Sequence, residues 1–311
     1  MDNAKFILIV LVIIGHCLEK FSSQGMNGSL YNTIYTFHMP LFIFITGYFT
    51  NTNKDKGKYF DGVLSLFLTF CIFQLFWFIF YRDFSVNAII NPAWTLWYLL
   101  STIYWKCLIY PLRKIDHKIL FGCSVIVALF GGFVPISILS IPRTLTFAPF
   151  FVLGYIARAR NFDFSKLRSI YLIVPSVVLM LGCLFTLKGD FSWLLFGSKN
   201  YHLYNCQTLI APLYRLVALM IGGLFSACIL AYAPSISATA KYGQNTLFYY
   251  LYHTIIIVAL IYVIAHLHIS KSIPLFLICT TIVIISLLVA EKIPLLGKIL
   301  RPYDIIKGEK K

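Results

Sequence analysis

Charged side chains are scarce in this sequence, and acidic ones are the scarcest. Of the 311 residues, 12% are charged and only 11 are Asp or Glu, whereas 59% are apolar and the mean hydropathy is +0.83. This apolar content exceeds what a water-soluble core needs, which excludes an ordinary soluble domain. The composition predicts an all-α, polytopic membrane protein.

Cysteine is nearly absent outside the apolar stretches. Seven of the eight cysteines fall within those stretches, and Cys206 lies in a loop without a partner, so neither a disulfide framework nor a zinc site is expected. Low-complexity linkers and convincing internal repeats are also missing. We therefore expect a single membrane domain over residues 1–311, with room for a small lid at most in its longest outer loop, 187–208.

Apolar stretches of membrane-spanning length recur along the whole chain. A hydrocarbon layer of roughly 30 Å needs about 20 apolar residues of helix, and about ten stretches come close to that length. The expected transmembrane helices cover residues 4–21, 31–50, 60–81, 94–111, 118–139, 143–158, 169–187, 208–232, 244–265 and 272–290.

The excess of positive charge determines orientation. The net charge is +15, but the basic residues gather in short loops between apolar spans, which argues against nucleic-acid binding. With ten spans and a cytoplasmic N-terminus, eighteen Lys and Arg lie on the inner side and six on the outer side. Because basic residues favour the cytoplasmic side, both termini are expected in the cytoplasm.

Ionisable residues inside the spans are the strongest indication of function. Each costs about 2.5–3.5 kcal/mol on insertion and therefore usually faces a cavity or a partner. His16 and Glu19 stand three positions apart on the first span, which puts them on one helical face. A carboxylate beside an imidazole suits a general base, but a polar pair joining two helices fits the spacing equally well.

The depth of the polar residues in the membrane favours the general base over the helix-joining pair. His38 and Arg215 each lie about seven residues, or roughly 10 Å, below the outer surface, and His16 is at a similar level. Arg143 marks the outer end of the sixth span. Such a cluster is unusual for core packing. His253 lies nearer the bilayer middle, where a catalytic role and a helix-joining role remain equally open.

Lys5 lies eleven residues before His16 on the same predicted helix, a separation of about 16 Å. A phosphate held by Lys5 at the inner face could belong to a long, thin ligand whose other end reaches His16. Coenzyme A has that shape.

These residues lie in motifs that resemble the acyltransferase 3 family of integral-membrane O-acyltransferases, and most closely its fucose 4-O-acetylase-like branch. The similarity covers nearly the whole chain and rests on DNAKFILIVLVIIGH, FHMPLFIFITGYF, WTLWYLL, RTLTFAPFFVLGY and KYGQNTLFYYLYH, in this order.

The resemblance implies a multi-pass protein of the bacterial inner membrane that uses cytoplasmic acetyl-CoA to acetylate a sugar hydroxyl at the outer side. The acceptor would be a surface polysaccharide or its lipid-linked precursor. His16 matches the family's essential histidine, and Lys5 stands where the family has a basic residue. Many members carry an Arg-x-x-Arg pair after the second span. This chain has three lysines there, whose ammonium groups are compact charges and lack the planar, two-pronged donor geometry of a guanidinium group. The three lysines are Lys54, Lys56 and Lys58.

The expected site therefore has a catalytic, an acceptor-binding and a donor-binding part, and it needs no metal. The expected catalytic residues are His16, Glu19 and His38; the acceptor-binding residues are Arg143, Arg215, His253 and Trp97; the donor-binding residues are Lys5, Lys54, Lys56 and Lys58. Two other functions remain open at this point. A transporter or flippase of acylated glycan also has many spans with buried charges, and an assembly partner in polysaccharide export would tolerate substitution of its buried polar groups.

Overall fold

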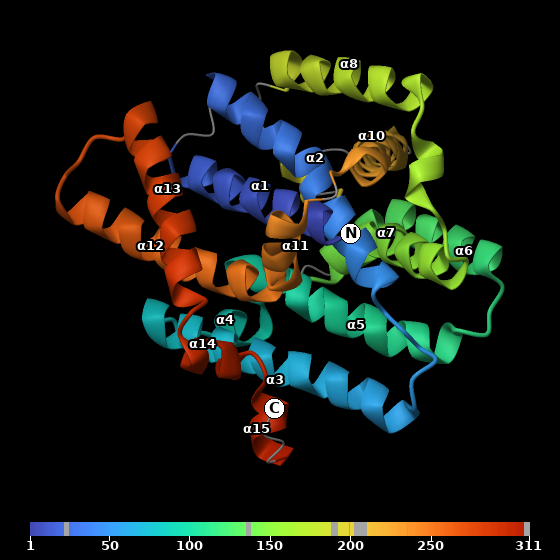
Figure 1. Cartoon of the computed structure of the whole chain (residues 1–311), viewed down its shortest axis with the longest axis horizontal. Coiled ribbons are helices and arrows are strands. Elements are labelled where there is room, and N and C mark those ends of the chain that lie inside the picture. Colours follow the sequence, from blue (N-terminus) through green and yellow to red (C-terminus); the bar gives the residue numbers. More distant parts are fainter. Residues whose placement is uncertain are drawn as a thin grey trace. The chain divides into compact units, whose positions relative to one another are not determined.

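A computed structural model describes residues 1–21, 25–134, 138–187, 192–198, 200–201, 210–234 and 236–307. Throughout these ranges the regular structure is helical, without strands, which confirms the all-α expectation (Figure 1). Cys206 and most of the loop 187–208 lie outside the described residues. The long helices are α1 (Asp2–Phe21), α2 (Gly25–Tyr48), α3 (Lys56–Tyr81), α5 (Trp97–Leu112), α6 (His117–Phe130), α7 (Ile141–Ala159), α8 (Ile170–Thr186), α10 (Ile210–Tyr232), α12 (Thr246–His266) and α13 (Ile273–Ala290).

Shorter helical segments connect or extend the long ones. They are α4 (Val86–Ile90), η1 (Trp94–Leu96), η2 (Gly131–Phe133), η3 (Phe164–Leu167), α9 (Ser192–Leu195), α11 (Ser237–Gln244), α14 (Pro294–Ile299) and α15 (Pro302–Lys307).

Each of the ten expected spans contains one long helix. Among the described residues, four helices are long and apolar enough to cross a membrane, namely α3, α10, α12 and α13, while α6 with η2 and α8 are apolar but shorter. The ninth expected span, 244–265, agrees with α12 to within two residues, and Asn245 separates α12 from the short helix α11 that precedes it. A membrane protein is thus supported, and ten crossings stay a prediction.

Aspartate side chains cap the N-termini of two helices. The Asp55 side chain accepts hydrogen bonds from the backbone amides of Gly57 and Lys58 at the start of α3. Asp116 does the same for Lys118 and Ile119 at the start of α6, and these bonds lower the pKa of its carboxyl group. Such caps satisfy amides that have no partner within the helix.

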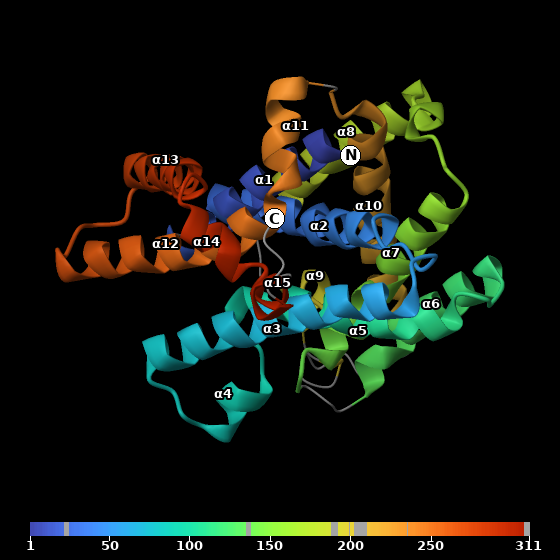
Figure 2. The same cartoon turned by 60° about the horizontal axis from the view of Figure 1, so that its bottom comes forward.

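The chain divides into two compact units. The first comprises residues Met1–Phe42, Asp163–Leu195 and Ala218–Leu296. In it α1 packs against α11, α12 and α13, and α12 lies beside α13 (Figures 1 and 2). The close approach of α11 to the start of α1 requires Gly243, because a Cβ there would lie 1.9 Å from the Asp2 carbonyl oxygen.

The second unit comprises residues Ile43–Phe162, Phe196–Val217 and Gly297–Lys311. Here α5 packs between α3 and α7, α6 packs on α7, and α15 lies against α3 (Figure 2). The end of α2 crosses α7 so closely that the two backbones touch. A Cβ on Gly47 would lie 2.0 Å from the Phe151 oxygen, and one on Gly154 would lie 1.9 Å from the Phe44 oxygen.

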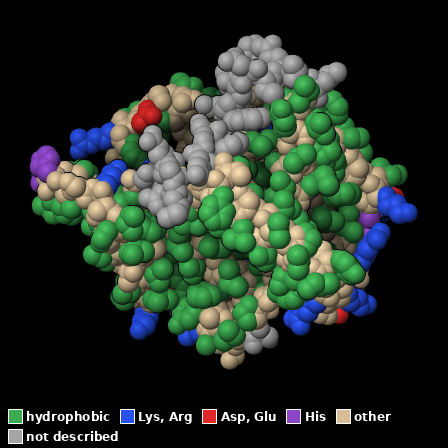
Figure 3. All heavy atoms as spheres, turned by 90° about the horizontal axis from the view of Figure 1, so that it is seen from above, with side chains coloured by type: hydrophobic (Ala, Val, Ile, Leu, Met, Phe, Trp, Pro, Cys, Tyr) green, Lys and Arg blue, Asp and Glu red, His purple; other side chains and the backbone are tan. Residues whose placement is uncertain are grey.

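Large apolar side chains remain exposed along the helices. Hydrophobic side chains cover much of the face seen in Figure 3. Ile79 on α3, Val178 on α8 and Leu277 on α13 are 59%, 62% and 57% exposed. Exposed apolar surface of this extent is typical of helices that face lipid.

Orientation can be tested with reporter fusions. The charge distribution predicts that a reporter fused after Lys311 is cytoplasmic and that one inserted within 187–208 is extracytoplasmic. Alkaline phosphatase is active only outside the cytoplasm, and a fluorescent protein that matures only in the cytoplasm reports the other side, so both reporters are placed at both positions. If both positions fall on one side, the expected topology and the depths derived from it are wrong.

Candidate active site

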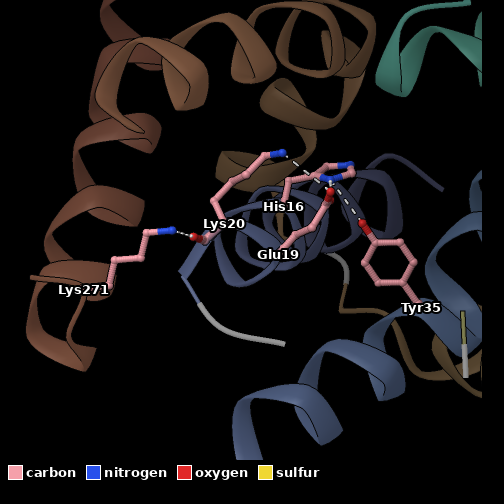
Figure 4. Close-up of polar contacts among 5 residues, drawn as sticks. All are labelled: His16, Glu19, Lys20, Tyr35 and Lys271. Carbon is pink, nitrogen blue, oxygen red and sulfur yellow. Dashed lines mark hydrogen bonds and ion pairs between the residues drawn. The ribbon is translucent and has the colours of Figure 1, made fainter. Parts of the chain in front are cut away.

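The central feature of the first unit is an imidazole beside a carboxylate. His16 lies on the buried side of α1, and its Nδ1 is 3.1 Å from Oε2 of Glu19, one helical turn further on (Figure 4). This contact follows from the three-residue spacing. Glu19 is also 3.7 Å from the ammonium group of Lys20, so the carboxylate lies between an imidazole and a cation.

The hydrogen bond determines which nitrogen of His16 can act as a base. An ionised carboxylate only accepts hydrogen bonds, so the Nδ1 that faces Glu19 carries the proton. The lone pair of the ring is then on Nε2. This is the tautomer that a general base needs, since the carboxylate also stabilises the imidazolium formed on protonation.

Tyr35 on α2 completes this arrangement, and the sequence did not single it out. Its hydroxyl lies 3.1 Å from the same Nδ1 of His16 (Figure 4). Its ring lies 4.3 Å from the ring of His38. The available signal was its spacing of three residues from His38, which puts both on one face of α2.

His38 and His253 share a second kind of contact. Each Nδ1 lies 2.9 Å from a backbone carbonyl oxygen one turn earlier, that of Ile34 for His38 and that of Tyr249 for His253. Because a carbonyl only accepts, both rings carry the proton on Nδ1 and the lone pair on Nε2. The ring of His253 lies 5.3 Å from that of His16, so α1, α2 and α12 bring three histidines together.

The predicted acceptor-binding residues of the second unit form two separate contacts. The Arg143 guanidinium lies 4.9 Å from the ring centre of Trp97, which stacks on Phe147. Arg215 is 2% exposed and lies 4.4 Å from the ring centre of Tyr201. These are cation–π arrangements. The grouping of both arginines with His16, made from depth alone, stays a prediction.

Tyr201 was also missed by the sequence, and it holds Arg215 beside η2. Its hydroxyl donates to the Leu129 carbonyl at 2.7 Å, and its backbone amide donates to the Gly132 carbonyl at 2.7 Å. Gly132 admits the tyrosine ring, since a Cβ there would come within 2.5 Å of it.

The predicted donor-binding lysines lie at helix starts. Lys5 is on α1 and forms an ion pair of 2.7 Å with Asp2, so a donor phosphate would compete with this carboxylate. Lys54, Lys56 and Lys58 are exposed and flank Asp55 at the start of α3. Within the described part of the chain, no group of three His, Cys, Asp or Glu side chains is placed to hold a metal ion.

Comparison with known proteins identifies the chemistry. The sequence profile of a family described as an acyltransferase domain matches residues 1–291. The chain belongs to the acyltransferase 3 family. The match includes α1 to α13 and hence every predicted site residue. An acyltransferase requires a base near the acceptor oxygen, and this is the role predicted for His16 with Glu19.

Two curated relatives of this acyltransferase are nodulation proteins. It is 26% identical over 176 residues to nodulation protein NolL of Sinorhizobium fredii, a segment that covers 50% of this chain and 47% of that protein. It is 39% identical over 80 residues to NolL of Mesorhizobium japonicum, covering 24% of this chain and 21% of that protein. The aligned part thus covers less than half of each relative. No solved structure matches the acyltransferase significantly.

Proposed function

We propose that this acyltransferase is a single-domain enzyme of the bacterial inner membrane that moves an acetyl group from cytoplasmic acetyl-CoA to a sugar hydroxyl. The acceptor is a surface polysaccharide or its lipid-linked precursor. Family membership supports acyl transfer, and the similarity of the motifs to the fucose 4-O-acetylase-like branch supports a sugar acceptor.

The observation that carries the proposal is the hydrogen bond between His16 and Glu19. It leaves the lone pair on Nε2 of the buried His16 imidazole, which is the nitrogen proposed to meet the substrate. In the proposed reaction Nε2 takes the hydroxyl proton as the sugar oxygen attacks the acetyl carbon, and Glu19 stabilises the resulting imidazolium.

The bond to sulfur then breaks, and His16 returns the proton to the thiolate. His38, Arg215, Arg143 and Trp97 are proposed to position the sugar or stabilise the oxyanion.

The donor is proposed to enter from the inner side, where Lys5 and the loop before α3 supply positive charge. The phosphates of acetyl-CoA would replace Asp2 as the partner of Lys5. Lys54, Lys56 and Lys58 are exposed, so each contributes modestly, because salt screens such charges within about 8–10 Å.

The proposal is tested by the acetyl content of the host's surface glycan. Acetyl signals in the NMR spectrum are expected in cells that carry the protein, to be lost on its deletion and to return with the wild-type chain. Membranes containing the protein should also transfer label from radioactive acetyl-CoA into the glycan fraction. An acetyl content that is independent of the protein, together with no transfer of label, would contradict the proposed function.

A further inference from the structure

His253 is buried more completely than its hydrogen bonds explain. The residue is 0% exposed, its Nδ1 donates to the Tyr249 carbonyl at 2.9 Å, and its Nε2 has no hydrogen-bond partner among the described residues. Leaving a buried acceptor unsatisfied costs about 1–3 kcal/mol. A histidine that only joins helices would be expected to bond through both nitrogens, so Nε2 is better explained as a group that meets its partner on ligand binding.

The tautomer restricts the kind of partner. Since Nδ1 carries the proton, Nε2 of His253 presents a neutral lone pair and can only accept. A phosphate, a carboxylate or a carbonyl oxygen would not satisfy it. The complementary ligand group is a neutral N–H or O–H donor.

His253 belongs to a segment that lies along α1 between Lys5 and His16. The Gly243 end of α11 contacts Asp2 at the start of α1, and Thr239 of α11 donates to the Asn3 side chain at 2.7 Å. Further along, the rings of His16 and His253 are 5.3 Å apart. The α11–α12 segment therefore accompanies α1 from the Lys5 end to the proposed base.

We propose that Nε2 of His253 accepts a hydrogen bond from the amide of acetyl-CoA nearest to the thioester. This inference rests on the proposed function, and it replaces the acceptor-binding role that the sequence predicted for His253. In acetyl-CoA two methylene groups separate the sulfur from that amide nitrogen, which matches a thioester held at His16 and an N–H held at the neighbouring ring. His253 remains neutral and uncharged throughout acyl transfer, because it gives and takes no proton.

The fold holds the Nδ1 side of His253. Its Nδ1 contact is to Tyr249, whose hydroxyl donates to Glu291 at the end of α13, and Glu291 also accepts from Asn245 at the start of α12. These contacts tie the first turns of α12 to α13. The imidazole is therefore oriented before the donor arrives, which reduces the entropy lost on binding.

The test is the kinetics of acyl transfer in membranes with His253→Phe and His253→Gln. Phenylalanine fills the site without an acceptor, whereas the glutamine amide oxygen can accept. For His253→Phe we expect the KM for acetyl-CoA to rise about three- to tenfold, the effect of one neutral hydrogen bond. Protein abundance and the KM for the glycan acceptor should stay unchanged, and His253→Gln should recover part of the loss.

Two shorter thioester donors test the contact with the amide by itself. S-Acetyl-N-acetylcysteamine retains the amide in question, and S-butyl thioacetate lacks it, so His253→Phe should lower kcat/KM for the first donor and leave that for the second unchanged. His266→Phe is a matched control, since His266 lies on the same helix but is exposed and stacks on Tyr262. It should behave as wild type with every donor.

The possible results distinguish a failure of the proposed acyl transfer from a failure of the proposed His253 contact. A wild-type protein that uses no acetyl thioester would overturn the proposed function. An active wild type whose KM for acetyl-CoA is the same in His253→Phe would overturn the inference alone. A rise in the acceptor KM instead would assign Nε2 to the sugar, and reduced abundance with normal kinetics would assign His253 to helix packing; either result also overturns it.

Discussion

Replacing His16 with alanine is expected to lower acyl transfer about 100- to 10,000-fold while the protein still inserts and folds. The loss is that of a positioned general base. His16 contacts Glu19 and Tyr35 through one nitrogen, and Glu19 is partly exposed and also lies beside Lys20, so its carboxylate keeps a partner when the imidazole is removed. The measurement is the transfer of label from acetyl-CoA into glycan, normalised to the amount of protein in the membrane.

Two companion variants make this result specific. Glu19→Gln should lose less activity, because the amide oxygen can still accept from Nδ1 but cannot stabilise the imidazolium charge. His266→Ala removes an exposed histidine and should be neutral. If His16→Ala instead lowers abundance and preserves activity per molecule, His16 is a helix-packing residue and the acyl-transfer site lies elsewhere.

Gly154→Ala is expected to destabilise the second unit by at least about 1–3 kcal/mol, the usual cost of overpacking. The added Cβ would lie 1.9 Å from the Phe44 carbonyl oxygen and 2.9 Å from the Tyr48 backbone nitrogen. Both contacts are with backbone, so no side chain can rotate away and α2 must move off α7. Small residues at such a crossing are what let two membrane helices approach closely.

The measurement is the thermal midpoint of the detergent-solubilised protein together with its abundance in the membrane. Gly122→Ala on α6 is the matched control, because nothing lies within 4 Å of the position of its Cβ. Since alanine favours helix over glycine, this control should be neutral or slightly stabilising. Equal midpoints for the two variants would mean that α2 and α7 do not cross as described.

Much of the helical architecture could be predicted from apolar run lengths, including a long helix within each of the ten stretches. The short helix α11 (Ser237–Gln244) was missed, because SATAKYGQ is too short and too polar to be found from apolar run length. The composition of a membrane helix also hides its buried face. Lipid and protein interior are both apolar, so hydrophobic periodicity does not separate a residue such as Leu277, which is exposed, from Val283, which is buried.

In the candidate site, contacts within one helix were predictable and contacts between helices were not. The sequence by itself determined that His16 and Glu19 meet and that Lys5 lies about 16 Å away, because 3.6 residues per turn and 1.5 Å per residue determine geometry within one helix. Only the tertiary structure decided that Tyr35 reaches the same nitrogen as Glu19, that His253 lies beside His16, and that Gly154 lies on the Phe44 backbone. These contacts join helices far apart in the chain, and they depend on how many side chains pack at once rather than on the spacing of any two residues.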